Sequence, residues 1–416
     1  MKPFRTLGAV ALVLAASHLT AQTVKLGGDV QFWYTQLLDT KPRLNSSVTP
    51  GNSAGYYNLR SEFKENTATV RRAEIKLSGT VVEGVEFEVM LDPSISVGTT
   101  NPVILQDAFI TWKLMPGLEV KAGQFKNLQT YEGLTSSTEI LFAERSQLGR
   151  MFGDKRDRGL ALSQAFGAPG NLAGKATLAV FNGMNDAISG KGNDSNAQKD
   201  FVGRLEFALG KTQRFGVYTL QGGTDLADKT GSSAAPVPLP YWPTQADVYG
   251  NKDKTTNSGA FYAYQDGTWT FTTEYMTGLL GRRFPTLGAG IKREHLEQKF
   301  AGYYLTGGYT TGCNTFLFRY DLMNFNNGNQ WYTPYNPYTQ TAPATAILAN
   351  GAAVDYTPKY TEVTLGYTYA WIPKTVKAAN LKLNYIARSK NFLKPFTGQT
   401  GEQGGNTLVA ALLVSF

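Results

Sequence analysis

Apolar and polar side chains alternate along much of this chain with a period of two residues. The alternation is clearest at 72–77, 85–89, 118–122 and 381–385. A period of two is typical of β-strands whose two faces meet different surroundings. We predict sixteen such strands, which begin near residues 24, 69, 84, 104, 118, 158, 175, 200, 213, 258, 268, 299, 314, 360, 379 and 405.

The connections between the expected strands alternate between short and long. The short ones carry the glycine, proline or aspartate residues of tight turns and lie at 82–84, 115–117, 167–174, 210–212, 266–267, 311–314 and 372–378. The long ones are expected at 35–68, 92–103, 126–157, 184–199, 224–257, 277–298, 325–359 and 390–404. This rhythm predicts an all-β fold, a transmembrane antiparallel β-barrel with short periplasmic turns and long extracellular loops. The barrel must close because backbone polar groups in hydrocarbon have to be paired within the protein.

Both ends of the chain fit export to the outer membrane of a Gram-negative-type cell. Lys2 and Arg5 precede a ten-residue apolar run at 7–16 and a small-residue cleavage site after Ala21. This pattern predicts a cleaved signal peptide at 1–21 and one barrel domain at 22–416. The run is shorter than the ~20 residues of a spanning helix. The chain ends on Phe416, which resembles the C-terminal signal bound by the outer-membrane assembly machinery.

The composition contains few residues for catalysis or metal binding. One cysteine and two histidines exclude a disulfide framework and cysteine-based zinc sites, so we expect no metal and no cofactor. His295 is the one histidine after the signal peptide, and we expect no enzyme. The net charge is +8, and the basic residues are scattered among acidic ones, which argues against nucleic-acid binding. A soluble β-sandwich with its charges in bulk water is the alternative fold.

One face of the expected strands is charged and the other is apolar. An Arg or Lys on the lipid face costs about 2–4 kcal/mol at the bilayer midplane, so the charged face should line the lumen. The basic residues expected there are Arg72, Lys76, Lys113, Lys121, Arg204, Arg319, Lys382 and Arg388, against seven acidic ones. A barrel of 16–18 strands encloses water. The pattern therefore predicts a channel for passive diffusion of small hydrophilic solutes.

Aromatic residues near the strand ends fit the girdles that such barrels place at the membrane surfaces. The candidates are Trp33, Tyr34, Trp112, Trp269, Tyr369 and Trp371. The surrounding lipid and lipopolysaccharide are the partners expected for this outer surface.

The third long connection, 126–157, is the best candidate for the constriction of the channel, and we call it loop three. Its apolar residues, such as Ile140 and Phe142, would be buried if the loop folded into the lumen. The spacing of Ser136 and Glu139 is that of a capping box and predicts a short helix after Ser136. The charged residues proposed for the constriction are Arg145, Arg150, Glu139, Glu144, Lys155 and Arg156. We expect Arg145 and Arg150 to attract anions; the alternative is a solvated loop whose charges pair with one another.

Loop three also carries a resemblance to a known family. The stretch 131–146, which contains Leu-Thr-Ser-Ser and Phe-Ala-Glu-Arg, and the Arg-Asp-Arg-Gly-Leu stretch within 153–162 resemble loop three of the phosphate-selective porin O/P family. The resemblance implies a sixteen-stranded barrel, a homotrimer and an anion-selective path. This sequence lacks the dense arginine ladder and the lysine cluster expected of a phosphate-specific constriction. We therefore predict a mild anion preference, with phosphate or other inorganic anions among the solutes. The alternative function is a structural sleeve or surface-interaction protein for a partner such as a periplasmic cytochrome.

Overall fold

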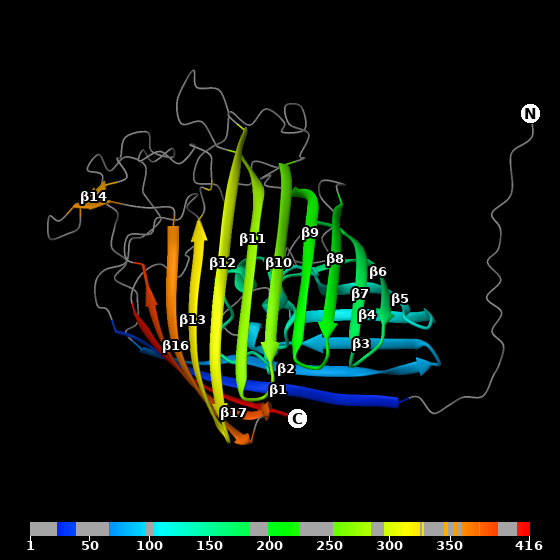
Figure 1. Ribbon diagram of the computed structural model, residues 1–416, viewed down its shortest axis with the longest axis horizontal. Helices are drawn as coiled ribbons and strands as arrows, with labels where there is room; N and C mark the ends of the chain where they lie inside the picture. The colour runs from blue at the N-terminus through cyan, green and yellow to red at the C-terminus, as the bar shows by residue number, and fades with distance from the viewer. Residues whose placement is uncertain are drawn as a thin grey trace, which may run out of the picture.

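A computed structural model shows sixteen antiparallel strands closed into one barrel (Figure 1). The structure describes residues 23–38, 66–96, 104–183, 199–224, 253–283, 295–324, 327, 345–347, 353–355, 359–373, 375–389 and 406–416. The expected signal peptide at 1–21 lies outside these residues. No helix within them is long and apolar enough to cross a membrane.

The barrel strands follow one another around the wall in chain order. They are β1 (Thr23–Leu37), β2 (Asn66–Val82), β3 (Val85–Leu91), β4 (Leu105–Met115), β5 (Leu118–Lys126), β6 (Arg156–Gly167), β7 (Leu172–Phe181), β8 (Asp200–Leu209), β9 (Gln213–Thr224), β10 (Asp253–Gln265), β11 (Trp269–Arg283), β12 (His295–Thr311), β13 (Asn314–Asn324), β16 (Lys359–Ile372), β17 (Thr375–Arg388) and β18 (Thr407–Ser415). A small hairpin of β14 (Thr345–Ile347) and β15 (Ala353–Asp355) lies between β13 and β16 in the sequence. The barrel closes where β1 pairs with β18.

The predicted barrel is confirmed, and each of the sixteen expected strands is present. The largest differences from the expected positions are at β10, β11 and β12, whose ends extend into segments assigned to long loops. The ladder there continues through residues that lack clear alternation, such as 277–283. Hydrogen bonding between strands does not require an apolar face. The strands therefore extend beyond the segments in which apolar and polar residues alternate.

The two faces of the wall differ in chemistry as well as exposure. On β13, Phe316 and Phe318 point outward and are 54% and 47% exposed, whereas Arg319 is 1% exposed on the inner side. Exposed apolar side chains such as Ile110 and Leu305 continue this surface around the barrel. An apolar outer surface is the one that hydrocarbon accepts, so the charges are kept on the inner side.

The aromatic girdle needs one correction. Trp269 and Tyr309 pack side by side on the outer face, with ring centroids 4.8 Å apart, and Trp371 is exposed beyond them. Trp33, in contrast, is buried on the inner side, while its neighbour Tyr34 is exposed. Successive residues of a strand point to opposite faces, so these two residues cannot both belong to the outer surface.

The short turns use backbone conformations that favour glycine. Gly84, between β2 and β3, has φ +79°, and Gly117, between β4 and β5, has φ +81°. A residue with a Cβ adopts such angles at an energetic cost, so these glycines allow the tight connections predicted at 82–84 and 115–117.

Candidate functional site

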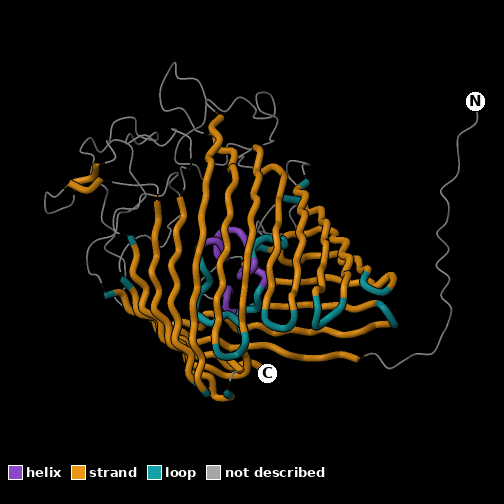
Figure 2. Tube along the Cα trace, viewed as in Figure 1, coloured by secondary structure: helices purple, strands orange, loops and turns teal. Residues whose placement is uncertain are grey.

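Loop three runs between β5 and β6 along the inner side of the wall. It contains two short helical turns, α1 (Tyr131–Leu134) and η2 (Gly149–Gly153). Both lie within the outline of the barrel (Figure 2). The helix expected after Ser136 is not found at that position, because α1 precedes that residue and η2 begins only at Gly149. Thr130 caps α1, its Oγ1 accepting the N–H of Gly133 at 3.0 Å, whereas the hydroxyl of Ser136 bonds with Thr138.

Wall cations bind the carbonyl groups of loop three. Lys382 Nζ donates to Ile140 O at 2.6 Å, Arg319 Nη1 to Glu144 O at 2.9 Å, and Arg204 Nη1 to Leu128 O at 3.2 Å. These three cations come from β17, β13 and β8, so the loop is attached on widely separated parts of the wall. A hydrogen bond from a charged donor is stronger than a neutral one. These side chains therefore hold the path of loop three.

Wall acceptors bind the N–H groups of the same loop. Glu274 Oε1 accepts from the N–H of Tyr131 at 2.7 Å, Asp321 Oδ1 from Gln147 at 3.1 Å, and Asn384 Oδ1 from Ala143 at 2.7 Å. A buried N–H without a partner is costly, so a non-regular loop inside a protein needs acceptors of this kind. The two sets of contacts together fix loop three by its backbone.

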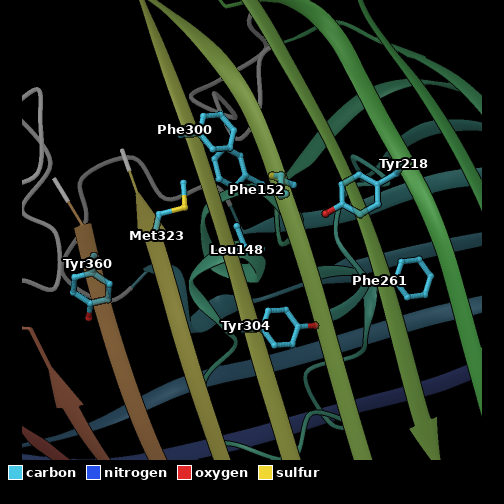
Figure 3. Close-up of a cluster of buried hydrophobic side chains, with 9 residues drawn as sticks. Leu148, Phe152, Tyr218, Phe261, Phe300, Tyr304, Met323 and Tyr360 are labelled. Carbon is cyan, nitrogen blue, oxygen red and sulfur yellow. The ribbon is translucent and has the colours of Figure 1, made fainter. Parts of the chain in front are cut away.

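Apolar contacts reinforce these hydrogen bonds. Leu148 and Phe152 of loop three enter a buried cluster formed by strands β9 to β13 and β16 (Figure 3). The ring of Phe152 stacks on that of Phe300, with centroids 4.8 Å apart. Earlier in the loop, the ring of Phe142 covers Gly366, where a Cβ would lie only 2.8 Å from the Phe142 ring. The missing side chain on β16 thus makes room for the loop.

Arg145 does not face the open lumen of the barrel. Its side chain is 1% exposed, and its guanidinium donates to Asp154 Oδ2 at 2.8 Å, to Thr135 O at 2.7 Å and to Glu132 O at 3.1 Å. The expectation that Arg145 lines the constriction is therefore corrected: it braces loop three from within. Its partners lie 9 to 13 residues away in the sequence, and only the folded loop brings them together.

Most of the other charged residues proposed for the constriction also bind protein groups. Arg150 Nη2 lies 3.2 Å from Glu362, Glu144 lies 3.0 Å from Arg71, and Arg156 lies 3.4 Å from Asp107. Lys155 is half-buried, and its carbonyl accepts from the N–H of Asn127 at 2.9 Å. Glu139 is the exposed member of the set, with a side chain 51% exposed and 3.7 Å from Lys377.

Two carboxyl groups of loop three, those of Glu144 and Asp154, are held in the charged form. Burial raises the pKa of Glu144, but the positive charges of Arg71, Arg72 and Arg150 outweigh burial and lower its pKa to about 2. The pKa of Asp154 is lowered in the same way, since Arg145 and three further cations overcome the effect of burial. Both groups therefore keep their ion pairs at neutral pH.

The eight basic residues expected on the inner face lie there but differ in their surroundings. Arg204, Arg319 and Lys382 hold loop three, Arg72 lies 4.0 Å from Asp154, and Arg388 lies 3.3 Å from Glu362. Lys76, Lys113 and Lys121 lie on a part of the wall away from these contacts. The second group belongs to a charged surface that solutes could meet, and Arg204 joins that surface through its pair with Glu206.

That surface, which we call the charged strip, lies on the inner side of β2 to β9. It contains the ion pairs Lys76–Glu88, Lys113–Glu86, Lys175–Glu119 and Arg204–Glu206. Lys121 lies over the ring of Phe109, 4.1 Å from its centroid, and Arg214 lies on the same face of β9 as Tyr218. No carboxylate in the described part of the chain lies within 4 Å of Lys121 or Arg214.

The sequence interpretation missed Lys175, Glu119 and Arg214. Each alternates with outward residues in its strand, as Arg214 does with the exposed Val217 three positions on. The alternation that identifies inward residues was present. Because we expected β7 to begin at 175, however, Lys175 stood at the very end of the expected strand and was not assigned to the inner face. Among the residues that the structure describes, no group of three or more His, Cys, Asp or Glu could hold a metal ion.

Comparisons with known proteins agree with this architecture. The sequence model of a family described as phosphate-selective porin O and P matches residues 48–391. No curated protein matches the chain. Among solved structures, the outer membrane channel DcaP of Acinetobacter baumannii is 12% identical, with a TM-score of 0.55 and coverage of 95% of this chain and 97% of that one. A loop-deletion mutant of OmpT from Vibrio cholerae is 13% identical, with a TM-score of 0.51 and coverage of 95% and 100%. At these identities the likeness shows the fold.

Proposed function

Since this chain belongs to the phosphate-selective porin O and P family, we propose that it forms a water-filled outer-membrane channel through which small hydrophilic solutes diffuse passively, with a mild preference for anions. The observation that carries the proposal is the charged strip. Lys113 is 52% exposed and Lys76 43%, so water reaches the inner wall beside loop three. The family and the barrel fold indicate a channel and no enzyme.

The anion preference rests on two cations of the charged strip. Its four ion pairs cancel in charge, and Lys121 and Arg214 remain without a carboxylate partner among the described residues. An excess of positive charge on a wall of low dielectric raises the local concentration of anions. Because the excess is small, chloride and phosphate should pass faster than cations of similar size, but cations should still pass.

The remaining sequence expectations complete the proposal. We propose that residues 1–21 are a cleaved signal peptide, that 22–416 form the barrel domain, and that the channel is a homotrimer surrounded by lipid and lipopolysaccharide. We also propose that Phe416 is bound by the outer-membrane assembly machinery during insertion. In its favour, the N–H and carbonyl of Phe416 pair with those of Gly28, at 3.0 and 3.1 Å, so the end of the chain joins the wall.

The experiment that tests the channel is a reversal-potential measurement. Purified protein in a planar bilayer with a potassium chloride gradient should give ohmic current steps and a reversal potential on the anion side. Lys121→Glu and Arg214→Glu should each move that potential toward the cation side, because each replaces a positive charge that has no carboxylate partner in the described part of the chain. Arg388→Glu, which alters a side chain already bound to Glu362, is the comparison and should have a smaller effect. Strong cation preference of the unmodified protein would contradict the proposal.

A further inference from the structure

The carboxylate of Asp154 lies at the centre of four cations. Its nearest partners are Arg145 Nη1 at 2.8 Å, Lys126 Nζ at 3.2 Å, Arg156 Nη1 at 3.3 Å and Arg72 Nη2 at 4.0 Å. They come from β2, the end of β5, loop three and the start of β6. The Asp154 side chain is 22% exposed, so water reaches this cluster, which we call the Asp154 cage.

Two cations of the cage have no second carboxylate within 4 Å among the residues that the structure describes. Arg72 lies 3.6 Å from Glu74, and Arg156 lies 3.4 Å from Asp107. For Lys126 and Arg145, Asp154 is the one carboxylate within 4 Å in the described part of the chain. Removing the charge of Asp154 would therefore leave two cations in a largely buried position without a counter-charge.

The cage is held in shape by contacts that do not involve Asp154. The Arg145 guanidinium also donates to two carbonyls of loop three, at 2.7 and 3.1 Å, and Lys126 Nζ donates to Gly133 O at 2.6 Å. The positive groups are thus positioned independently of the carboxylate among them. A preformed arrangement of cationic donors is suited to an oxyanion, because carboxylate and phosphate oxygens accept the same hydrogen bonds.

We propose that the Asp154 cage is an anion-binding centre occupied by the protein's own carboxylate, and that Asp154 is the residue that keeps the channel weakly selective. The inference rests on the proposed channel function and specifies which residue limits its anion affinity. An inorganic phosphate or other oxyanion in the lumen meets a site whose centre is already filled by a carboxylate. Without that carboxylate, the same four cations would take up the anion.

The first test measures stability and needs no current. Asp154→Asn keeps the shape of the side chain and removes its charge. The denaturation temperature of this variant should be below that of the unmodified protein. It should rise when phosphate is added at constant ionic strength, because a ligand that binds the folded state stabilises it. The unmodified protein should show no such rise. Glu139→Gln is the control: it removes a loop-three charge that lies near a single lysine, Lys377, and should also show no rise.

The second test measures selectivity in planar bilayers. Asp154→Asn should move the reversal potential toward anions more than Glu139→Gln does, and millimolar phosphate should reduce its chloride current. Asp154→Glu, which retains the charge, should move the reversal potential less than Asp154→Asn does. Equal shifts in Asp154→Asn and Glu139→Gln would mean that any lost negative charge has this effect, and would overturn the proposal.

Three further outcomes also overturn it. One is an Asp154→Asn variant whose stability does not respond to phosphate. Another is an unmodified protein that is itself stabilised by phosphate, since its cage would then not be occupied. If Asp154→Asn does not fold, refolding is repeated with phosphate present, and failure there is the third. If no protein conducts, the proposed function fails, while the stability measurements still decide the role of Asp154.

Discussion

At the scale of the residue, a charged side chain on the inner wall acquires its role from its partner. Lys382 and Lys113 both alternate with outward apolar residues, yet Lys382 is buried on the backbone of loop three, while Lys113 pairs with Glu86 in contact with water. The alternation predicts the face for both lysines. The role depends on where loop three lies, and for Lys382 the relevant carbonyls are more than 200 residues away in the sequence.

This difference predicts unlike effects from the same substitution. Lys382→Met removes the donor to Ile140 O and Phe142 O, a charge-assisted bond worth about 1.5–3 kcal/mol. Loop three should be held less firmly, so single-channel recordings should show larger fluctuations of the open-channel current and little change in reversal potential.

Lys113→Met is the matched control for that recording. It removes one charge of an exposed pair, so it should move the reversal potential toward cations and leave the fluctuations unchanged. If the two variants behaved alike, the distinction between residues that hold loop three and residues of the charged strip would be wrong.

At the scale of the element, strands could be predicted, whereas the path and the contacts of loop three could not. A strand is recognised from some ten consecutive residues, because alternation is a local property. Loop three takes its shape from Glu274, Asp321 and Asn384, on three separate strands. The capping-box spacing at 136–139 was a local signal, and these distant contacts prevailed over it.

The ion pairs of loop three should make its attachment depend on pH. The pKa of Glu144 lies near 2, below its ordinary value of 4.5. Its charged form therefore stabilises the folded loop by about 3 kcal/mol above pH 4.5, and this contribution is lost as the pH falls from 4.5 toward 2. The pKa of Asp154 is lowered too, which adds to the effect in the acid range.

We expect current fluctuations to increase when the pH is lowered from 7 to 3, and Glu144→Gln to show large fluctuations already at pH 7. Asp266 provides the control. Hydrogen bonds from the N–H groups of Trp269 and Thr268 lower the pKa of this carboxyl, but it lies in the turn between β10 and β11. Asp266→Asn should leave the pH response of the current unchanged, and a response abolished by this variant would contradict the assignment.

At the scale of the whole molecule, the outer surface is set by the requirements of hydrocarbon. Along β12, Leu305 lies between Tyr303, whose ring contacts that of Tyr320, and Tyr309, whose ring contacts that of Trp269. That position corresponds to the apolar band between two girdles. The sequence predicts this band well, because lipid contact imposes the same requirement on every strand.

A charge introduced in this band should destabilise the barrel. Leu305→Arg should lower the free energy of unfolding in lipid vesicles by about 2–4 kcal/mol, whereas Leu172→Arg, at the end of β7 beside a short turn, should lower it by about 0–1 kcal/mol. Urea titration of the two variants provides the comparison. Equal losses would mean that Leu305 does not contact the hydrocarbon centre.

The pairing of β1 with β18 has a consequence for biogenesis. The two strands that form this seam, from Asp29 opposite Ser415 to Leu37 opposite Thr407, lie at opposite ends of the barrel sequence. Until the last nine-residue strand arrives, β1 and β17 both present unpaired backbone edges, which readily join other chains. A nascent barrel of this kind must be shielded along both edges until its final strand has been delivered. A chain that lost this strand would keep both edges unpaired and would be prone to aggregate.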